Sequence, residues 1–171
     1  MAKTTISWTD YTFNPWMGCS KVSEGCRNCY AEKLTTGRMG LDVWGADAQR
    51  QVTKAPWKNA EKWDRMARDS GESIRVFCAS LCDVFEDHPT ANENRHRVWD
   101  LIRRCDALDW QILTKRPERI AECLPDDWGD GWPHVWLGTT IEDQRVAHRR
   151  DVLASVPAAI RFVSYEPAIG P

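Results

Sequence analysis

Four short apolar runs between residues 74 and 165 decide the fold. They read IRVFCA at Ile74–Ala79, WQILT at Trp110–Thr114, HVWLGT at His134–Thr139 and IRFVSY at Ile160–Tyr165. Each run is rich in β-branched or aromatic residues and is bounded by polar residues or proline, which is typical of buried strands. We expect one earlier strand within Thr12–Gly18.

Helical patterns fill the gaps between these runs. Trp57–Ser70 should form a helix that Gly71 ends, and Thr90 begins a capping-box pattern at the start of another helix. Thr140 is expected to cap a later helix. Because strands and helices alternate, the sequence predicts βα units and a mainly parallel sheet.

The fold class that we predict is α/β, as an incomplete parallel βα barrel that is TIM-like but partial. An open doubly wound sheet is the alternative. One domain is expected over residues 1–171, with a loop or small insertion at residues 35–56, which are polar and lack a clear period. The sequence ends at Pro171 soon after the last strand run, where a parallel sheet normally adds a covering helix. We therefore expect a C-terminally truncated domain.

Composition excludes several classes of protein. Apolar residues make up 42% and charged residues 28% of the chain, which argues against a disordered tail, a coiled coil or a fibre. No apolar run is long enough to cross a bilayer, and the first ten residues do not resemble a signal peptide. A cytoplasmic protein without a membrane partner is expected. The net charge of −2 argues against binding nucleic acid through overall charge alone.

The sharpest chemical signal is the loop Cys19-Ser-Lys-Val-Ser-Glu-Gly-Cys26-Arg-Asn-Cys29. Gly18 and Gly25 each precede a cysteine, where they allow the backbone to turn sharply. Thiols stay reduced in the cytosol, so clustered cysteines there indicate metal binding or catalysis before disulfides. Thiolates are soft ligands that suit zinc or an iron–sulfur cluster.

The number of ligands separates these two metals. A structural zinc site needs four protein ligands, whereas the loop supplies three. His88, Cys78 and Cys82 are candidates for a fourth ligand, but they are distant in the sequence. A four-iron four-sulfur cluster held by three cysteines keeps one iron open for a substrate or cofactor. The loop therefore favours the cluster, and zinc remains the alternative.

Polar residues follow every predicted strand. In both α/β architectures the chemistry lies at the carboxyl ends of the strands. The residues found there are Ser80, Lys115, Arg116, Thr139, Glu142, Ser164 and Glu166. Helix capping and solvated loops are the ordinary alternative for such positions, and salt bridges to neighbouring carboxylates are the alternative for the two cations.

The motifs together carry a resemblance that spans nearly the whole chain. They are Trp8-Thr9-Asp10, Asn14-Pro15-Trp16, Gly18-Cys19, Gly25-Cys26-x-x-Cys29-Tyr30-Ala31, Leu113-Thr-Lys-Arg-Pro117, Trp136–Asp143 and Phe162–Pro167. This set resembles a phage- and prophage-associated family of three-cysteine proteins of unknown function. That family in turn resembles radical S-adenosylmethionine enzymes of the spore photoproduct lyase type. Those enzymes usually space their cysteines C-x3-C-x2-C, whereas the first gap here is six residues.

The resemblance implies an enzyme in which Cys19, Cys26 and Cys29 each bind one iron of a four-iron four-sulfur cluster. S-adenosylmethionine would bind the fourth iron. Reduction by a partner protein would then yield a 5′-deoxyadenosyl radical that modifies an unknown substrate, expected to be nucleic acid or a nucleotide.

The resemblance and the strand-end positions also suggest contacts for the cofactor. Tyr30 would pack near the adenine, and Ser80, Thr139 and Ser164 would hold its polar groups. Lys115 and Arg116 would bind its carboxylate or a substrate phosphate. Glu142 and Glu166 would bind ribose hydroxyls or an amine.

Two other functions remain open. One is a non-catalytic module, stabilised by zinc, that binds nucleic acid or protein through a basic helix. Its basic residues are Arg145, His148, Arg149 and Arg150. The other is a non-functional fragment whose exposed sheet edge would cause aggregation.

Overall fold

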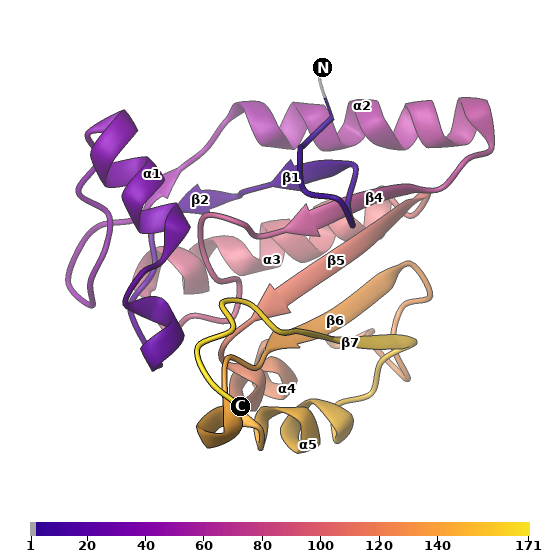
Figure 1. Ribbon diagram of the computed structural model, residues 1–171. Coiled ribbons are helices and arrows are strands. Elements are labelled where there is room, and N and C mark those ends of the chain that lie inside the picture. Colours follow the sequence, from indigo (N-terminus) through magenta and orange to yellow (C-terminus); the bar gives the residue numbers. More distant parts are fainter. Residues whose placement is uncertain (1–2) are drawn as a thin grey trace.

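The computed structural model describes residues 3–171, and its centre is a five-stranded parallel sheet (Figure 1). The strands are β1 (Tyr11–Phe13), β4 (Ile74–Cys78), β5 (Leu108–Thr114), β6 (Val135–Thr140) and β7 (Ile160–Ser164), in that spatial order. The order follows the chain without a reversal. Right-handed crossovers then place the connecting helices on a single face of the sheet.

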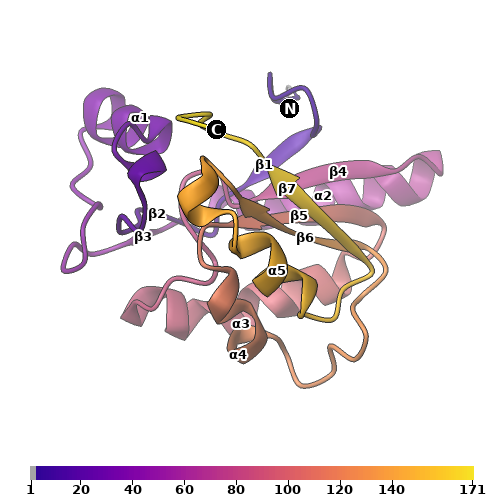
Figure 2. The same ribbon diagram turned by 60° about the horizontal axis from the view of Figure 1, so that its bottom comes forward.

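The helices cover one face, as Figure 2 shows. They are α2 (Ala55–Ser70), α3 (Pro89–Arg104), α4 (Ile120–Cys123) and α5 (Arg149–Ala154), with the short turn η2 (Pro117–Arg119) ahead of α4. The predicted α/β class and parallel sheet are confirmed. The sheet is only partly barrel-like and does not close, because β1 and β7 each have one strand neighbour.

The segment between β1 and α2 lies largely beside the sheet. It contains a two-stranded antiparallel ribbon of β2 (Trp16–Met17) and β3 (Gln51–Val52), the turn η1 (Glu24–Cys26) and the helix α1 (Tyr30–Met39). Figure 1 shows α1 standing apart from the other helices. The predicted loop at residues 35–56 is therefore helical at both ends, and the single strand predicted at Thr12–Gly18 is split between β1 and β2.

Aromatic side chains join the helices to the sheet. Tyr11 stacks on Trp63 of α2 with ring centroids 4.4 Å apart, and Phe13 meets the edges of Trp57 and Trp110 at 5.4 Å. Trp110 is completely buried at the centre of β5. Much of the high tryptophan content therefore fills the core, where large apolar surfaces contribute most to stability.

The helix starts differ from two predictions. The N-cap of α3 is His88, whose Nδ1 accepts from the N–H of Thr90 at 3.2 Å, so Thr90 is not the cap. Pro89 explains the shift, because its fixed φ suits the first helical position. Thr140 ends β6, and the cap of the following turn, η3 (Gln144–Val146), is Asp143. The helix predicted to end at Gly71 does so.

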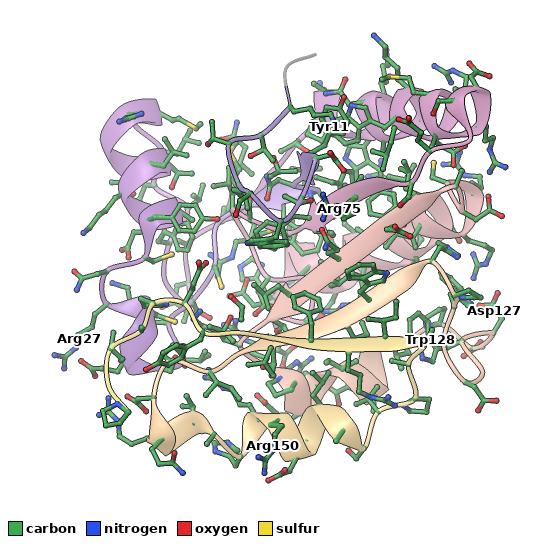
Figure 3. The ribbon with its side chains drawn as sticks, turned by 45° about the vertical axis from the view of Figure 1, so that its right-hand side comes forward. Tyr11, Arg27, Arg75, Asp127, Trp128 and Arg150 are labelled. Atoms are coloured by element: carbon green, nitrogen blue, oxygen red, sulfur yellow. The ribbon has the colours of Figure 1, made fainter. Side chains whose placement is uncertain are left out.

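The face of the sheet opposite the helices is covered in part by the N-terminal segment, which crosses β1 and β4 in Figure 1. The rotated view in Figure 3 shows side chains filling the space around Arg75 of β4. None of the helices within residues 3–171 is long and apolar enough to span a membrane.

Candidate functional site

The cysteine loop is fixed to the carboxyl end of β4. Gly18 pairs with Cys82 in a parallel bridge, and its N–H donates to the carbonyl of Leu81 at 3.0 Å. Its φ is +109°, and a Cβ there would overlap the carbonyl oxygen of Val43. Only glycine fits such a position without strain. This bridge places Cys19 directly beside the strand ends, where the sequence predicts the chemistry.

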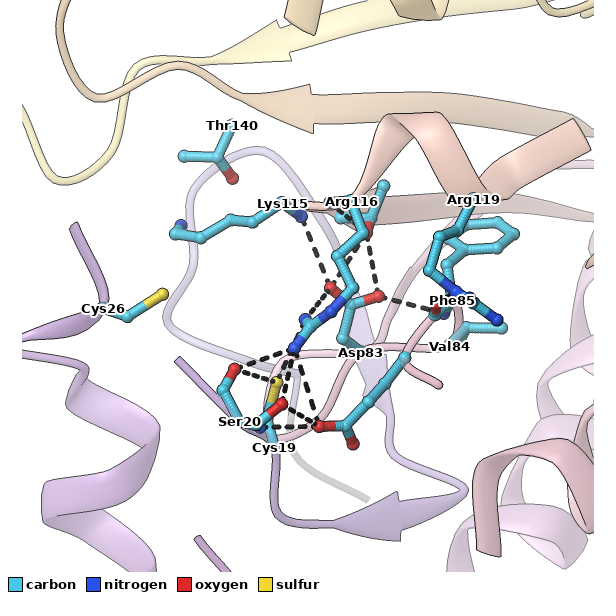
Figure 4. Close-up of polar contacts among 12 residues, drawn as sticks. Cys19, Ser20, Cys26, Asp83, Val84, Phe85, Lys115, Arg116, Arg119 and Thr140 are labelled. Atoms are coloured by element: carbon cyan, nitrogen blue, oxygen red, sulfur yellow. Dashed lines mark hydrogen bonds and ion pairs between the residues drawn. The ribbon is translucent and has the colours of Figure 1, made fainter. Parts of the chain in front are cut away.

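Arg116 links the first cysteine to the end of β4. Its Nη1 donates to Asp83 at 2.9 Å and to the sulfur of Cys19 at 3.4 Å, while Nη2 donates to the carbonyl and hydroxyl of Ser20. Figure 4 shows the guanidinium lying between Asp83 and the cysteine loop. Thr114 donates its hydroxyl to the same carboxylate at 2.8 Å. Arg116 is therefore held in a buried ion pair.

Burial and neighbouring charges have opposing effects on the pKa values of Arg116 and Cys19. Burial disfavours a charged guanidinium, but the carboxylate of Asp83 raises the pKa of Arg116. Burial and Asp83 raise the pKa of the Cys19 thiol to about 12, although Arg116 acts in the opposite direction. In the metal-free protein this thiol stays protonated at neutral pH.

A second buried ion pair, between Arg50 and Glu86, fixes the start of the cysteine loop. Arg50 donates from Nε and Nη2 to the carboxylate of Glu86 at 2.9 Å, and the side chains are 0% and 2% exposed. Glu86 also accepts from the N–H and hydroxyl of Ser20 at 2.6 and 2.7 Å. Arg50 donates further to the carbonyls of Val43, Ala48 and Gly45. This pair ties residues 43–50 and the first cysteine to the loop after β4.

A third contact joins the middle of the loop to β6. Glu142 accepts from the hydroxyl of Ser23 and from Arg149, each at 2.7 Å, and lies 3.5 Å from the ammonium of Lys115. A Cβ on Gly25 would overlap the Glu142 side chain. Glycine therefore lets the loop approach this buried carboxylate just before Cys26.

The remaining predicted site residues differ in how exposed they are. The hydroxyl of Tyr30 donates to the carbonyl of Ser80 at 2.8 Å, and burial of that hydroxyl raises the pKa of Tyr30 to about 12. The carboxylate of Glu166 lies close enough to contribute to this shift, and Ser164 is half-buried on β7. Thr139 is completely buried and donates to the carbonyl of Thr114.

Lys115 is the strand-end cation that faces the opening. Figure 4 shows it extending away from Arg116, toward the side on which Cys26 lies. Its side chain is 22% exposed, against 6% for Arg116. An incoming anion can therefore reach Lys115 without breaking the Asp83 ion pair.

The donor chemistry of the loop fits a soft metal or an iron–sulfur cluster. Cys19, Cys26 and Cys29 are free thiols, each partly exposed, and Cys26 has a weak contact at 3.9 Å with the hydroxyl of Ser23. Among residues 3–171, no three His, Cys, Asp or Glu side chains converge closely enough to share one metal ion. The three sulfur atoms would have to move together to hold one.

Sequence reasoning missed the residues that position the loop. They are Asn14, Ser20, Ser23, Arg50, Asp83, Glu86 and Arg149. Asp83 and Glu86 stand in a run directly after β4, so the strand-end rule pointed to their location. Nothing local in the sequence marks Arg50, and the sequence predicts Arg149 only as part of a basic binding helix. The partners of both residues are fixed only by the folded chain.

Two surface hollows differ in their relation to the cysteine loop. The larger, of about 510 Å³, lies between α3 and residues 122–127, and none of its lining residues belongs to the cysteine loop. The smaller, of about 200 Å³, is bounded by Ser23, Gly25, Glu142 and Ile169. The smaller one belongs to the site because the loop and the end of β6 form its walls.

These features define an α/β protein whose cysteine loop is fixed to the strand ends of a parallel sheet. The chain belongs to the family described as protein of unknown function (DUF5131), whose model matches residues 3–171. No curated protein matches the chain, and no solved structure does. Membership in a family of unknown function is confirmed. The phage association and the likeness to radical S-adenosylmethionine enzymes stay predictions.

Proposed function

We propose that the protein is a radical S-adenosylmethionine-like iron–sulfur enzyme of phage or prophage origin that modifies a nucleic acid or nucleotide. One observation carries the proposal. The three-cysteine loop lies at the carboxyl edge of an unreversed parallel sheet and is joined to three successive strand ends. In parallel α/β folds this edge is where cofactors and substrates bind.

Cys19, Cys26 and Cys29 would hold the cluster. When bound with S-adenosylmethionine, such a cluster supplies one-electron radical chemistry, for which a reductant protein is the partner. Arg116 donates to the sulfur of Cys19. Hydrogen bonds to ligating sulfurs tune the potential of a cluster, so this is the role that we assign to Arg116 in place of direct carboxylate binding.

The cofactor contacts then fall to the side chains that face the opening. Lys115 would bind a carboxylate in exchange for its 3.5 Å contact with Glu142, and the exposed ring of Tyr30 lies beside Ser80 for adenine packing. Glu166 and Ser164 remain for the ribose hydroxyls or the amine. The hydroxyl of Thr139 donates to the carbonyl of Thr114 inside the sheet, so Thr139 would position the end of β5 and not contact the cofactor.

A zinc site is the second candidate because one observation favours it. Cys82 pairs with Gly18, the neighbour of Cys19. Burial and the nearby thiols of Cys78 and Cys19 raise its pKa, which disfavours the thiolate that zinc binds, so the observation in favour is the proximity alone. The fold thus brings a fourth thiol to the loop, which would complete a structural zinc site.

The basic helix gives little support to nucleic-acid binding. Arg149 is buried against Glu142, and Arg145 pairs with Asp143. Arg150, on the outer side of α5 in Figure 3, pairs with Asp151. The predicted basic helix is divided, because Arg145 lies in η3 and α5 begins at Arg149, and the three arginines are paired with carboxylates.

Metal analysis distinguishes the two candidates. The protein is purified and reconstituted without oxygen, and its iron, sulfide and zinc contents are measured. The enzyme proposal predicts about four irons per chain, lost in Cys29→Ala and retained in both Cys82→Ala and the control Cys123→Ala. One tightly bound zinc without iron, lost in Cys82→Ala, would overturn the enzyme proposal in favour of the structural site.

A further inference from the structure

The face of the sheet opposite the helices carries a row of aromatic and amide side chains. The register places Phe77, Gln111 and Trp136 side by side on β4, β5 and β6. Because side chains alternate along a strand, this row faces away from the one that contains Trp110 and packs under the helices. The row therefore lines the concave side of the partial barrel.

An indole from the N-terminal segment occupies this concave side. Trp8 lies 4.7 Å from the ring of Phe77 on β4 and 6.3 Å from the ring of Phe162 on β7. The ring of Phe162 in turn lies over Gly138, where any Cβ would overlap it. One planar ring thus lies between two phenylalanines on the same face of the sheet, one from β4 and one from β7.

The amide of Gln111 contacts the main chain of Trp8 through its nitrogen, and its oxygen is unpaired. Its Nε2 donates to the main-chain carbonyl of Trp8 at 3.4 Å, while its Oε1 has no partner. The residue is only 4% exposed. Among residues 3–171 it is the only buried side-chain acceptor without a partner. Buried acceptors are rarely left unpaired, so this one indicates a missing donor.

We propose that this face binds a planar heteroaromatic ring that takes the place of the Trp8 indole. Phe77 and Phe162 would flank the ring, as aromatic side chains do for bases. An amide complements a ring edge that carries an amino N–H beside a ring nitrogen, because Oε1 accepts and Nε2 donates. The ligand class is therefore an aminopurine or aminopyrimidine.

The position of Gln111 separates this ring site from the cysteine loop. Gln111 lies three residues before the end of β5, which is roughly 10 Å inside the carboxyl edge. The ring site is therefore assigned to the substrate rather than to the adenine of the cofactor. That assignment, but not the binding site itself, rests on the proposed function.

Calorimetry with two nucleosides tests the site in the unmodified protein. Adenosine carries the amino group, and purine riboside is the same molecule without it. We expect adenosine to bind about tenfold more tightly, because purine riboside leaves the buried acceptor unpaired. Equal affinities, or no binding of either nucleoside, would overturn the proposal. This comparison needs no variant, so it does not depend on whether a substitution folds.

Three variants sharpen the test. Gln111→Leu should bring the two affinities within about twofold of each other, because it removes the acceptor. Trp8→Ala should bind adenosine several-fold more tightly, because no indole competes for the space. Trp44→Ala removes an indole from the outlying segment and should leave both affinities unchanged. Loss of adenosine binding in Trp8→Ala would show that the indole is a wall of the site and not its competitor, which contradicts the proposal.

Two further arms separate this inference from the proposed function. Cys29→Ala should bind adenosine as well as the wild type does, because the ring site does not use the cluster. Excess S-adenosylmethionine should leave adenosine bound, whereas displacement would assign the site to the cofactor and overturn the substrate assignment. If the protein holds about four irons but does not bind adenosine, the proposed function stands and the ring site is refuted.

Discussion

Glu86→Gln provides the most direct test of how the cysteine loop is held. The carboxylate and its partner Arg50 are 2% and 0% exposed, and the carboxylate accepts four hydrogen bonds from Arg50 and Ser20. The amide removes the charge and places an NH2 group against a donor. Breaking a buried ion pair from one side costs about 3–5 kcal/mol, because the other charge stays buried and unpaired.

For a chain of this size that cost lowers the melting temperature by roughly 6–20 °C. Thermal and urea unfolding measure the loss directly. Glu61→Gln is the matched control, because Glu61 pairs with Arg104 on the surface at side-chain exposures of 42% and 60%. An exposed pair contributes about 0–1 kcal/mol. If the two variants lose equal stability, the buried pair does not hold the loop and the reasoning is refuted.

The same pair sets a pH dependence. Burial alone would raise the pKa of Glu86, but hydrogen bonds from Arg50 and Ser20 outweigh burial and lower the pKa from its ordinary value of 4.5. The stabilisation is therefore complete above pH 4.5 and is lost as the pH falls through the lower pKa of the folded state. The stability difference between wild type and Glu86→Gln should shrink below pH 4.5, and a constant difference down to pH 2 would contradict this assignment.

Two further predictions concern the loop itself. Gly25→Ala should destabilise the fold and lower metal loading, because the new Cβ overlaps Glu142, whereas Gly37→Ala on α1 meets nothing within 4 Å and should be neutral or stabilising. Unfolding curves and metal analysis of both variants check this, and equal behaviour would contradict it. In the metal-free protein, Cys19 should alkylate at pH 8 roughly a thousandfold more slowly than in urea, because its pKa is about 12 instead of 9.0. Mass spectrometry of timed samples measures the rate, and fast labelling of Cys19 would refute the raised pKa of this thiol.

The sheet could be predicted from the sequence because its signals are local. The observed strands β4 to β7 match the predicted runs closely. Each strand begins within two residues of the start of its run and ends within one residue of the end. Short apolar runs rich in β-branched or aromatic residues, with polar residues or proline at their ends, mark such strands without knowledge of the neighbouring strands. The N-cap of α3 is predicted at Thr90 but lies at His88. Pro89 suits the first helical position, and this preference outweighs the capping-box pattern that begins at Thr90.

The candidate site could be predicted only in outline. The strand-end rule located Arg116 and Glu142, but it could not show that both are buried in ion pairs. Arg50 lies in a segment without periodicity, and its partner Glu86 is 36 residues away. Pairing across such separations is set by the topology, and a single sequence carries no local signal for it.

The sequence separations of these contacts indicate how the loop is assembled. The loop-to-sheet bonds join Ser20 to Glu86, Cys19 to Arg116 and Ser23 to Glu142, across 66, 97 and 119 residues. Each bond requires the end of a different strand region, after β4, β5 and β6 respectively, to be in place. The cysteines therefore adopt their positions only once the parallel sheet has formed. Any ligand that draws the three sulfurs together must stabilise those strand ends as well, because binding and folding then share the same contacts.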